Sequence, residues 1–268
     1  MEIGLLMLVG GVAAGAFGSL LGLGGGLLIV PLLTIGFGLP LREAVGVSLV
    51  CVIVTSSASA GVYLQRRQAN LRLGMVLELF TAIGAIAGGL VAFLIDERVL
   101  AALFAALLVY VAVTMLRGRS TAVDDEVAPS GLEGAATAAP APEVIPRRFP
   151  AGIAGSLGAG VVSALLGIGG GTVKVPVMHL VMGVPLRVAT ATSNLMIGIT
   201  ASASAIVYLL RGGIDVNAAG PTAVGVFVGA TIGSRLGGHV EVRLLRRLFV
   251  AVLLFTAFEM ARRAVGAS

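Results

Sequence analysis

The sequence predicts an all-α integral membrane protein built from two homologous repeats, and three observations support this prediction. First, 57% of the 268 residues are hydrophobic and 12% are charged, whereas a soluble domain carries about 25% charged residues. Second, apolar runs of membrane-spanning length follow one another along the chain. Third, the two halves of the chain repeat one another. We therefore expect a polytopic membrane protein.

The repeat appears at one constant offset. Gly22 and Gly167 lie 145 positions apart, and with this shift residues 10–117 align with residues 155–262 without a gap. More than thirty aligned positions are identical. This regularity indicates an internal duplication, which is a common architecture among transporters.

Three regions follow from the composition. Residues 1–117 form the N-terminal transmembrane repeat and residues 150–268 form the C-terminal one. Residues 118–149 are rich in Pro, Ala and acidic side chains, which is typical of a disordered linker. We expect this linker to be cytoplasmic.

Each repeat contains four apolar segments. They run over 3–39, 43–64, 73–95 and 99–116 in the first repeat, and over 150–186, 188–210, 216–234 and 244–261 in the second. The first segment of each is too long for one helix. It is interrupted by "GLGGG" at 22–26, here called the first break, or by "GIGGG" at 167–171, the second break. We expect four to five transmembrane segments per repeat, with the first broken or re-entrant.

The loop charges bear on membrane orientation. In the first repeat, residues 66–72 carry three arginines and residues 96–98 are mixed in charge; in the second, the arginine-rich loop is 235–247 instead of 211–215. By the positive-inside rule, equivalent loops face opposite sides. This reversal predicts inverted repeats with both termini outside. Two C-terminal arginines, Arg262 and Arg263, favour the alternative of parallel repeats with both termini inside.

The glycine clusters are the first candidate for a binding site. Glycine permits a sharp backbone break, and a break inside a membrane is tolerated where it lines a cavity or a ligand. The helix that begins after the break presents N–H groups suited to an anion. The alternative is close helix packing. The candidate substrate-binding glycines are Gly24, Gly25, Gly26, Gly169, Gly170 and Gly171.

Hydroxyl groups crowd the second segment of each repeat. Ser48 and Thr55 are seven residues apart, on one helix face, and Ser193 and Thr200 repeat this spacing. With Asn194, these side chains can donate hydrogen bonds to an anion without adding charge. Bonding to the carbonyls of their own helices is the alternative.

Two ionisable residues lie in apolar surroundings, where a functional role is the default hypothesis. Lys174 follows the second break and aligns with Ile29, while Glu78 aligns with Ala223. Lys174 is a candidate substrate ligand, and Glu78 is a candidate for coupling to a proton or sodium ion or for pairing with Lys174. Snorkelling of Lys174 towards the interface is the alternative.

The sequence favours no enzyme. It contains one Cys and two His, too few for common metal or nucleophilic centres. We therefore expect no metal, no cofactor and no nucleic-acid partner. The oligomeric state is left open.

Two stretches carry a family resemblance. "GSLLGLGGGLLIVPLL" followed by "GLPLREAVGVSLV", and "SALLGIGGGTVKVPVM" followed by "GVPLRVATATSNLMIGITASASA", resemble the TauE/SafE family of sulfite and organosulfonate exporters. The resemblance covers both repeats and leaves out the linker. It implies a multi-pass carrier of the inner or plasma membrane that exports small sulfur-containing anions by alternating access. An anion channel, or a transporter of another small anion, is the alternative.

Overall fold

The computed structural model of the protein describes residues 2–20, 26–65, 70–116, 148–236 and 242–266. Within these ranges the chain is helical and contains no strand. The first repeat contains α1 (Glu2–Leu20), α2 (Gly26–Pro31), the π-helical η1 (Leu32–Gly36), α3 (Leu41–Gln65), α4 (Leu71–Ala92) and α5 (Glu97–Leu116). The second contains α6 (Phe149–Leu166), α7 (Gly171–Pro176), the π-helical η3 (Val177–Val181), α8 (Leu186–Leu210), α9 (Val216–Leu236) and α10 (Val242–Val265).

The helices have the length and polarity of membrane spans. Among the described residues, five stretches are long and apolar enough to cross a bilayer: Leu71–Ala92, Glu97–Leu116, Phe149–Leu166, Val188–Leu210 and Val216–Gly233. Many large apolar side chains on their outer faces are exposed, as expected for contact with lipid rather than water. The predicted all-α multi-pass membrane architecture is therefore confirmed.

Each broken first segment folds back on itself. A Cβ atom added at Gly155 in α6 would lie 2.7 Å from Cγ1 of Val177 in η3. The equivalent glycine, Gly10 in α1, faces Leu32 in η1 at 3.1 Å. The segment after each break therefore runs back beside the helix before it. With about 1.5 Å per residue, the return arm is too short to cross a bilayer, and its re-entrant placement in a membrane stays a prediction.

The return arms widen at the same point. Pro31 and Pro176 end α2 and α7, and a π-helical turn follows each of them. Proline lacks the N–H group that a regular helical hydrogen bond needs. The missing bond is a physical cause for the change from α-helix to π-helix after each proline. The duplicated prolines thus shape the two arms alike.

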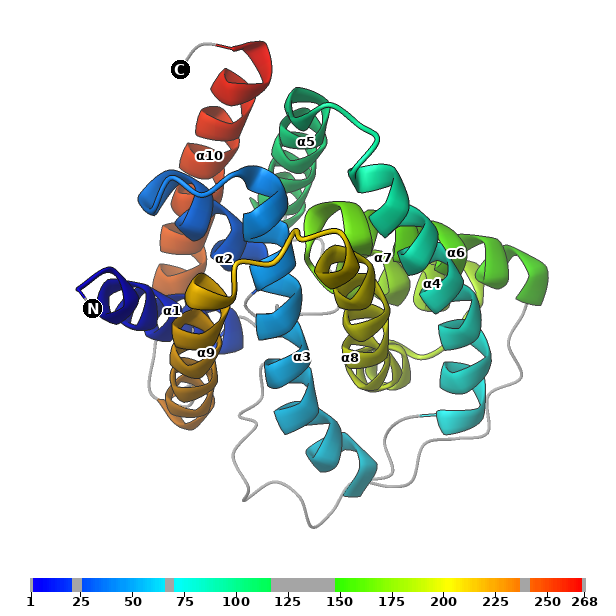
Figure 1. Ribbon diagram of the computed structural model, residues 1–268. Coiled ribbons are helices and arrows are strands. Elements are labelled where there is room, and N and C mark those ends of the chain that lie inside the picture. The colour runs from blue at the N-terminus through cyan, green and yellow to red at the C-terminus, as the bar shows by residue number, and fades with distance from the viewer. Residues whose placement is uncertain (1, 21–25, 66–69, 117–147, 237–241, 267–268) are drawn as a thin grey trace.

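The repeats exchange partners through close glycine contacts. Helix α1 packs on α9, and α6 packs on α4, as Figure 1 shows. A Cβ added at Gly84 would lie 2.1 Å from the carbonyl oxygen of Leu157, and one at the equivalent Gly229 would lie 2.0 Å from that of Val12. The first helix of each repeat is therefore held by the third long helix of the other.

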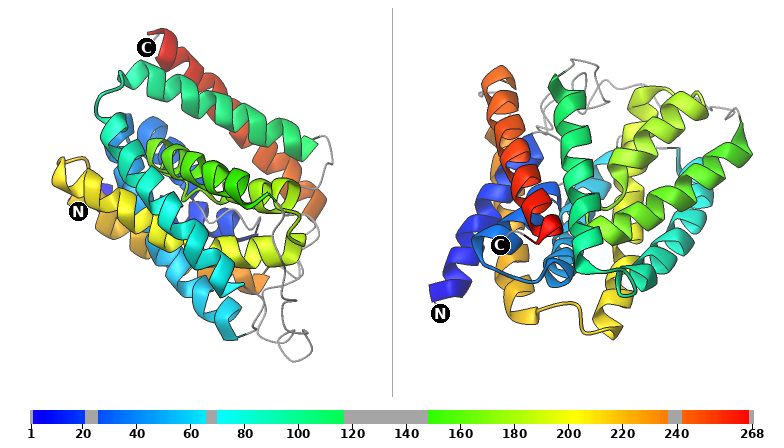
Figure 2. Two further views of the ribbon diagram at one scale, coloured as in Figure 1. Left: turned by 90° about the vertical axis from the view of Figure 1, so that its right-hand side faces the viewer. Right: turned by 90° about the horizontal axis from the view of Figure 1, so that it is seen from above.

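Equivalent helices that contact each other run in opposite directions. The start of α3 meets the end of α8, where Gly46 lies against Gly213. The start of α5 meets the end of α10, where a Cβ on Gly266 would lie 3.7 Å from Cζ of Arg98. Figure 2 shows α5, in green, beside α10, in orange to red. Inverted repeats have this property, and their orientation in a membrane stays a prediction.

Candidate functional site

The second break is a turn that only glycine forms readily. Gly167, Gly169 and Gly170 have φ angles of 70°, 75° and 78°, a left-handed region that other residues rarely occupy. Gly167 ends α6, and α7 begins at Gly171. At the first break, Gly26 begins α2, while the predicted site residues Gly24 and Gly25 lie outside the described residues.

The two breaks meet. A Cβ added at Gly26 would lie 3.1 Å from the carbonyl oxygen of Gly167. Ser48 Oγ lies 2.8 Å from that oxygen and 3.2 Å from the carbonyl oxygen of Gly26, so its hydroxyl can donate to either. The predicted ligand Ser48 thus fastens one break to the other.

Apolar side chains fill the contact between the breaks. A Cβ on Gly169 would lie 2.8 Å from Cγ1 of Val52 and 2.6 Å from Cγ2 of Ile197. Val52 and Ile197 occupy equivalent positions of α3 and α8. This packing explains why Gly169 must lack a side chain.

A buried polar triad lies beside the second break. Lys174 Nζ on α7 donates to Oε2 of Glu78 on α4 at 2.9 Å and also to Oγ1 of Thr200 on α8. The Thr200 hydroxyl donates in turn to Oε1 of Glu78 at 2.6 Å. Lys174 and Glu78 are 1% and 4% exposed. Of the two roles considered for Glu78, the structure displays the pairing with Lys174. The Lys174 side chain is buried inside the protein and does not reach its surface.

Unpartnered hydroxyls surround the same break. Ser163, Thr172 and Ser193 each have a buried hydroxyl oxygen without a hydrogen-bond partner in the described part of the chain. Oγ of Ser163 would lie 3.5 Å from a Cβ on Gly170, and Oγ of Ser193 would lie 3.6 Å from one on Gly171. Leaving a buried polar group unpaired costs about 1–3 kcal/mol, so these donors are suited to a ligand.

Sequence reasoning missed Ser163. The repeat alignment was the available signal, because the residue equivalent to Ser163 is Gly18 and the hydroxyl is present in only one copy. Thr172 was missed in the same way, since it aligns with Leu27.

The remaining predicted ligands are less clearly placed at the break. The Thr55 hydroxyl lies 3.1 Å from the carbonyl oxygens of Cys51 and Val52 in its own helix, as the alternative reading of the hydroxyls expected. Asn194 is half-buried on α8. Among the predicted residues, those gathered at the second break are Lys174, Thr200, Ser193, Gly169, Gly170, Gly171 and Glu78.

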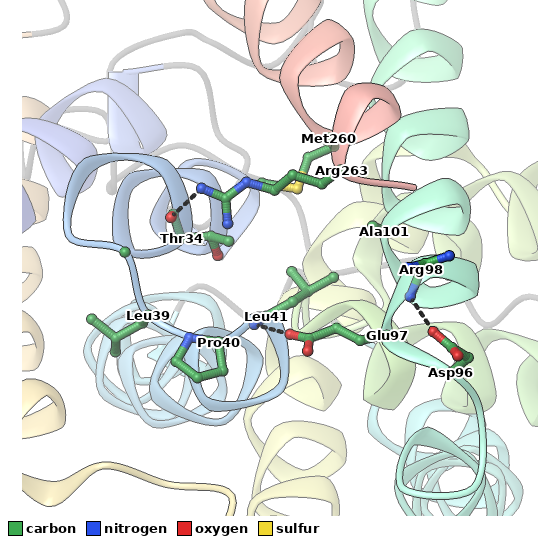
Figure 3. A pocket seen from close by; sticks show the side chains of 11 residues that line it. Thr34, Leu39, Pro40, Leu41, Asp96, Glu97, Arg98, Ala101, Met260 and Arg263 are labelled. Atoms are coloured by element: carbon green, nitrogen blue, oxygen red, sulfur yellow. Dashed lines mark hydrogen bonds between the residues drawn. The ribbon is translucent and has the colours of Figure 1, made fainter. Parts of the chain in front are cut away.

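A separate pocket of about 490 Å³ lies where η1, α3, α5 and α10 meet (Figure 3). Its charged lining residues include Glu97, which accepts a hydrogen bond from the backbone N–H of Leu41, and Arg263, which donates to the carbonyl oxygen of Thr34 at 2.9 Å. These charges hold neighbouring segments together. None of the predicted site residues lines this pocket.

Known membrane transporter proteins are similar to this chain along almost its whole length. The sequence profile of the sulfite exporter TauE/SafE family matches residues 7–260. The probable membrane transporter protein YunE of Bacillus subtilis is 24% identical over 256 residues, covering 93% of this chain and 92% of that protein. A probable membrane transporter protein of Methanocaldococcus jannaschii is 26% identical over 267 residues, covering 92% and 91%. One of Xylella fastidiosa is 28% identical over 251 residues, covering 92% and 90%. No solved structure matches the chain.

Proposed function

This chain belongs to the sulfite exporter TauE/SafE family, and on that premise we propose that it is a secondary transporter of small sulfur-containing anions. Sulfite and small organosulfonates are the proposed substrates, and export from the cell is the proposed direction. The relatives named above are themselves described as probable membrane transporter proteins.

The proposed anion site is the second break. The observation that carries this proposal is the set of unpartnered hydroxyls of Ser163, Thr172 and Ser193, beside the turn that ends at Gly171. An oxyanion accepts several hydrogen bonds, and bonds to a charged group contribute about 1.5–3 kcal/mol each. Lys174, one helical turn beyond Gly171, supplies the positive charge.

We propose that transport proceeds by alternating access, and the packing around the second break supports this. Val52 and Ile197 pack against the turn from equivalent positions on α3 and α8. In this proposal they separate the site from one side of the membrane. Because equivalent helices run antiparallel, a rocking motion of one repeat against the other exposes the site alternately to the two sides.

Flux measurements on the purified protein in proteoliposomes test this function. We expect saturable, trans-stimulated flux of sulfite or of a small alkyl sulfonate, with sulfate and thiosulfate as competitors. Flux that rises linearly with concentration and shows no trans-stimulation would instead indicate a channel. If none of these anions moves, the substrate proposal is wrong.

Orientation is tested separately. The C-terminal end of α10 lies beside the α4–α5 turn at Arg98, so we propose that both face outside, as the inverted arrangement requires. A fluorescent protein that matures only in the cytoplasm, fused to the C-terminus, should stay dark. Bright fusions would contradict the inverted arrangement.

A further inference from the structure

The triad at the second break forms a neutral unit sealed from solvent. Nζ of Lys174 and Oε2 of Glu78 are 2.9 Å apart, and both side chains are 5% exposed or less. A positive and a negative group are thereby paired. Two of the three ammonium hydrogens are used by Glu78 and Thr200. The third has no acceptor within the described residues.

No other described ionisable group faces this pair. Helix α4 packs on α6, which carries no ionisable residue, and on α8. In α8, Arg187 lies in the first turn, Arg211 directly follows the last residue, and the hydroxyl of Tyr208 donates to the carbonyl oxygen of Ala164 at 3.0 Å. The ionisable residue of η3 is His179, and its Nδ1 lies 2.9 Å from the carbonyl oxygen of Val184. Arg72 lies at the start of α4 itself. The charges of Lys174 and Glu78 are thus balanced by each other.

An anion bound beside Lys174 disturbs this balance. Adding one negative charge to a buried neutral pair leaves a net charge in a medium of low polarity, which is costly. Glu78 already holds the ammonium that the anion needs. One added proton on the Glu78 carboxylate relieves both problems, because it restores neutrality and releases Lys174 to the anion.

We propose that Glu78 takes up one proton for each monovalent anion bound at the second break, making the protein an electroneutral proton–anion cotransporter. This inference rests on the proposed function. In the loaded state, the proton resides on a Glu78 oxygen and Lys174 donates to the anion. The Thr200 hydroxyl stays bonded to the carboxyl group. On release at the other side, the anion and the proton leave together and the Glu78–Lys174 pair forms again.

In a coupled transporter, the gradients of the anion and of the proton together determine the direction of net transport. Each bound proton raises the affinity for the anion, and each bound anion raises the affinity for the proton by the same factor. Net movement follows the combined gradients. Export proceeds when the outward anion gradient exceeds the inward proton gradient, as it does when the anion is produced inside the cell.

The Lys174–Glu78 pair has no ionisable counterpart at the equivalent positions of the other break. The positions equivalent to Lys174 and Glu78 are Ile29 and Ala223, both buried and apolar. The first break therefore carries no ionisable pair at these positions, and we expect one proton per transport cycle.

Accumulation in proteoliposomes tests the proposal. A small alkyl sulfonate such as ethanesulfonate is the probe, because its acid is strong and any accompanying proton is carried by the protein. Sulfite is measured in parallel. With one proton per anion, a gradient of one pH unit should change the equilibrium accumulation of the sulfonate about tenfold. A membrane potential of about 100 mV should leave it unchanged, whereas an uncoupled monovalent anion would shift about 50-fold.

Variants assign the proton to its residue. In Glu78→Gln, accumulation should follow the potential and lose its response to the pH gradient. The double variant Glu78→Gln with Lys174→Gln has no buried charge to leave unpaired, and its residual flux should carry no protons. Glu259→Gln is the control, since Glu259 lies on α10 and pairs with Arg262 at 3.4 Å. It should behave as the wild type does.

The outcomes separate the two proposals. Wild-type flux that follows the potential without proton movement overturns the coupling and leaves the transporter function standing. Proton coupling that persists in both Glu78 variants also overturns the role of Glu78. Absence of flux for every anion overturns the proposed function and this inference with it.

Discussion

The two breaks have the same sequence pattern, and the arms that follow them, from Gly26 and from Gly171, fold back alike, but the side chains around them differ. At the second break, Lys174 pairs with Glu78. At the first, Ile29 and Ala223 occupy the equivalent positions and are buried in an apolar core. The backbone of the duplication has been kept in both copies, whereas ionisable chemistry is present in one.

The hydroxyls differ in the same direction. The Ser48 hydroxyl lies within hydrogen-bond distance of a carbonyl oxygen from each break and can donate to either, while its counterpart Ser193 has no partner within the described chain. Apolar packing is often at least as stabilising as a buried ion pair. Polar groups kept at a site where apolar ones would suffice point to a ligand. In our proposal, the first break therefore supports the fold and the second binds the anion.

Giving the second break the residues of the first should have the largest effect. Lys174→Ile leaves Glu78 buried without its partner, so we expect a loss of ~3–5 kcal/mol in stability. Adding Glu78→Ala should recover most of this loss, because both charges are then absent. Thermal unfolding in detergent measures both variants. Both variants should transport sulfite far more slowly than the wild type does, and a wild-type rate in the double variant would show that the anion is bound elsewhere.

Where the repeats are alike, paired substitutions should act alike. Gly84→Ala and Gly229→Ala each place a Cβ about 2 Å from a backbone carbonyl oxygen of the partner helix. We expect each to cost up to about 3 kcal/mol through overpacking. Gly158→Ala is the control, because a Cβ there meets no atom within 4 Å. Unfolding that differs clearly between the first two variants would contradict their equivalence.

Substitution of the two equivalent threonines should have the next largest effect, and it should lower stability more at the second break than at the first. Thr200 bonds both members of the ion pair, so Thr200→Val should lower stability by about 2 kcal/mol, the contribution of bonds to charged groups. Thr55→Val removes bonds to carbonyls of its own helix and should cost no more than about 1 kcal/mol. Chemical unfolding monitored by circular dichroism compares them. Equal losses would remove the distinction.

The matched serines give the smallest stability effects and the sharpest contrast. Ser48→Ala should lower stability by about 1 kcal/mol, since a bond between the breaks is lost. Ser193→Ala should leave stability within about 0.5 kcal/mol. It should raise the half-saturating sulfite concentration roughly tenfold, because an anion ligand is removed. Unchanged transport by Ser193→Ala would exclude its hydroxyl from the site.

Much of this arrangement was predictable from the sequence because it is local. The glycine clusters and the prolines five residues after them predicted the breaks, and the repeat offset predicted matching helices. Lys174 and Glu78 were noticeable as charges in apolar segments, so their pairing was one of the stated possibilities. Local pattern and composition carry this information.

The rest depends on tertiary contacts. In the sequence of α6, Ser163 differs from a serine bonded to its own helix only in its alignment with Gly18, and its place beside Gly170 depends on the fold. The exchange of α1 and α6 between the repeats could not be read from their small residues, because such faces fit many partners. The packing of Val52 and Ile197 against Gly169 likewise becomes visible only when α3 and α8 are brought together.

The partner exchange between α1 and α9, and between α6 and α4, also bears on biogenesis. When the ribosome has produced the first repeat, the glycine face of α1 has no partner, since α9 begins only at Val216. Helix α4 likewise lacks its packing partner until α6 has been synthesised. The N-terminal half therefore enters the bilayer unfinished and matures only after the C-terminal half follows it. Two halves synthesised as separate chains have every interlocking contact needed to assemble, whereas either half alone lacks the surface that completes it.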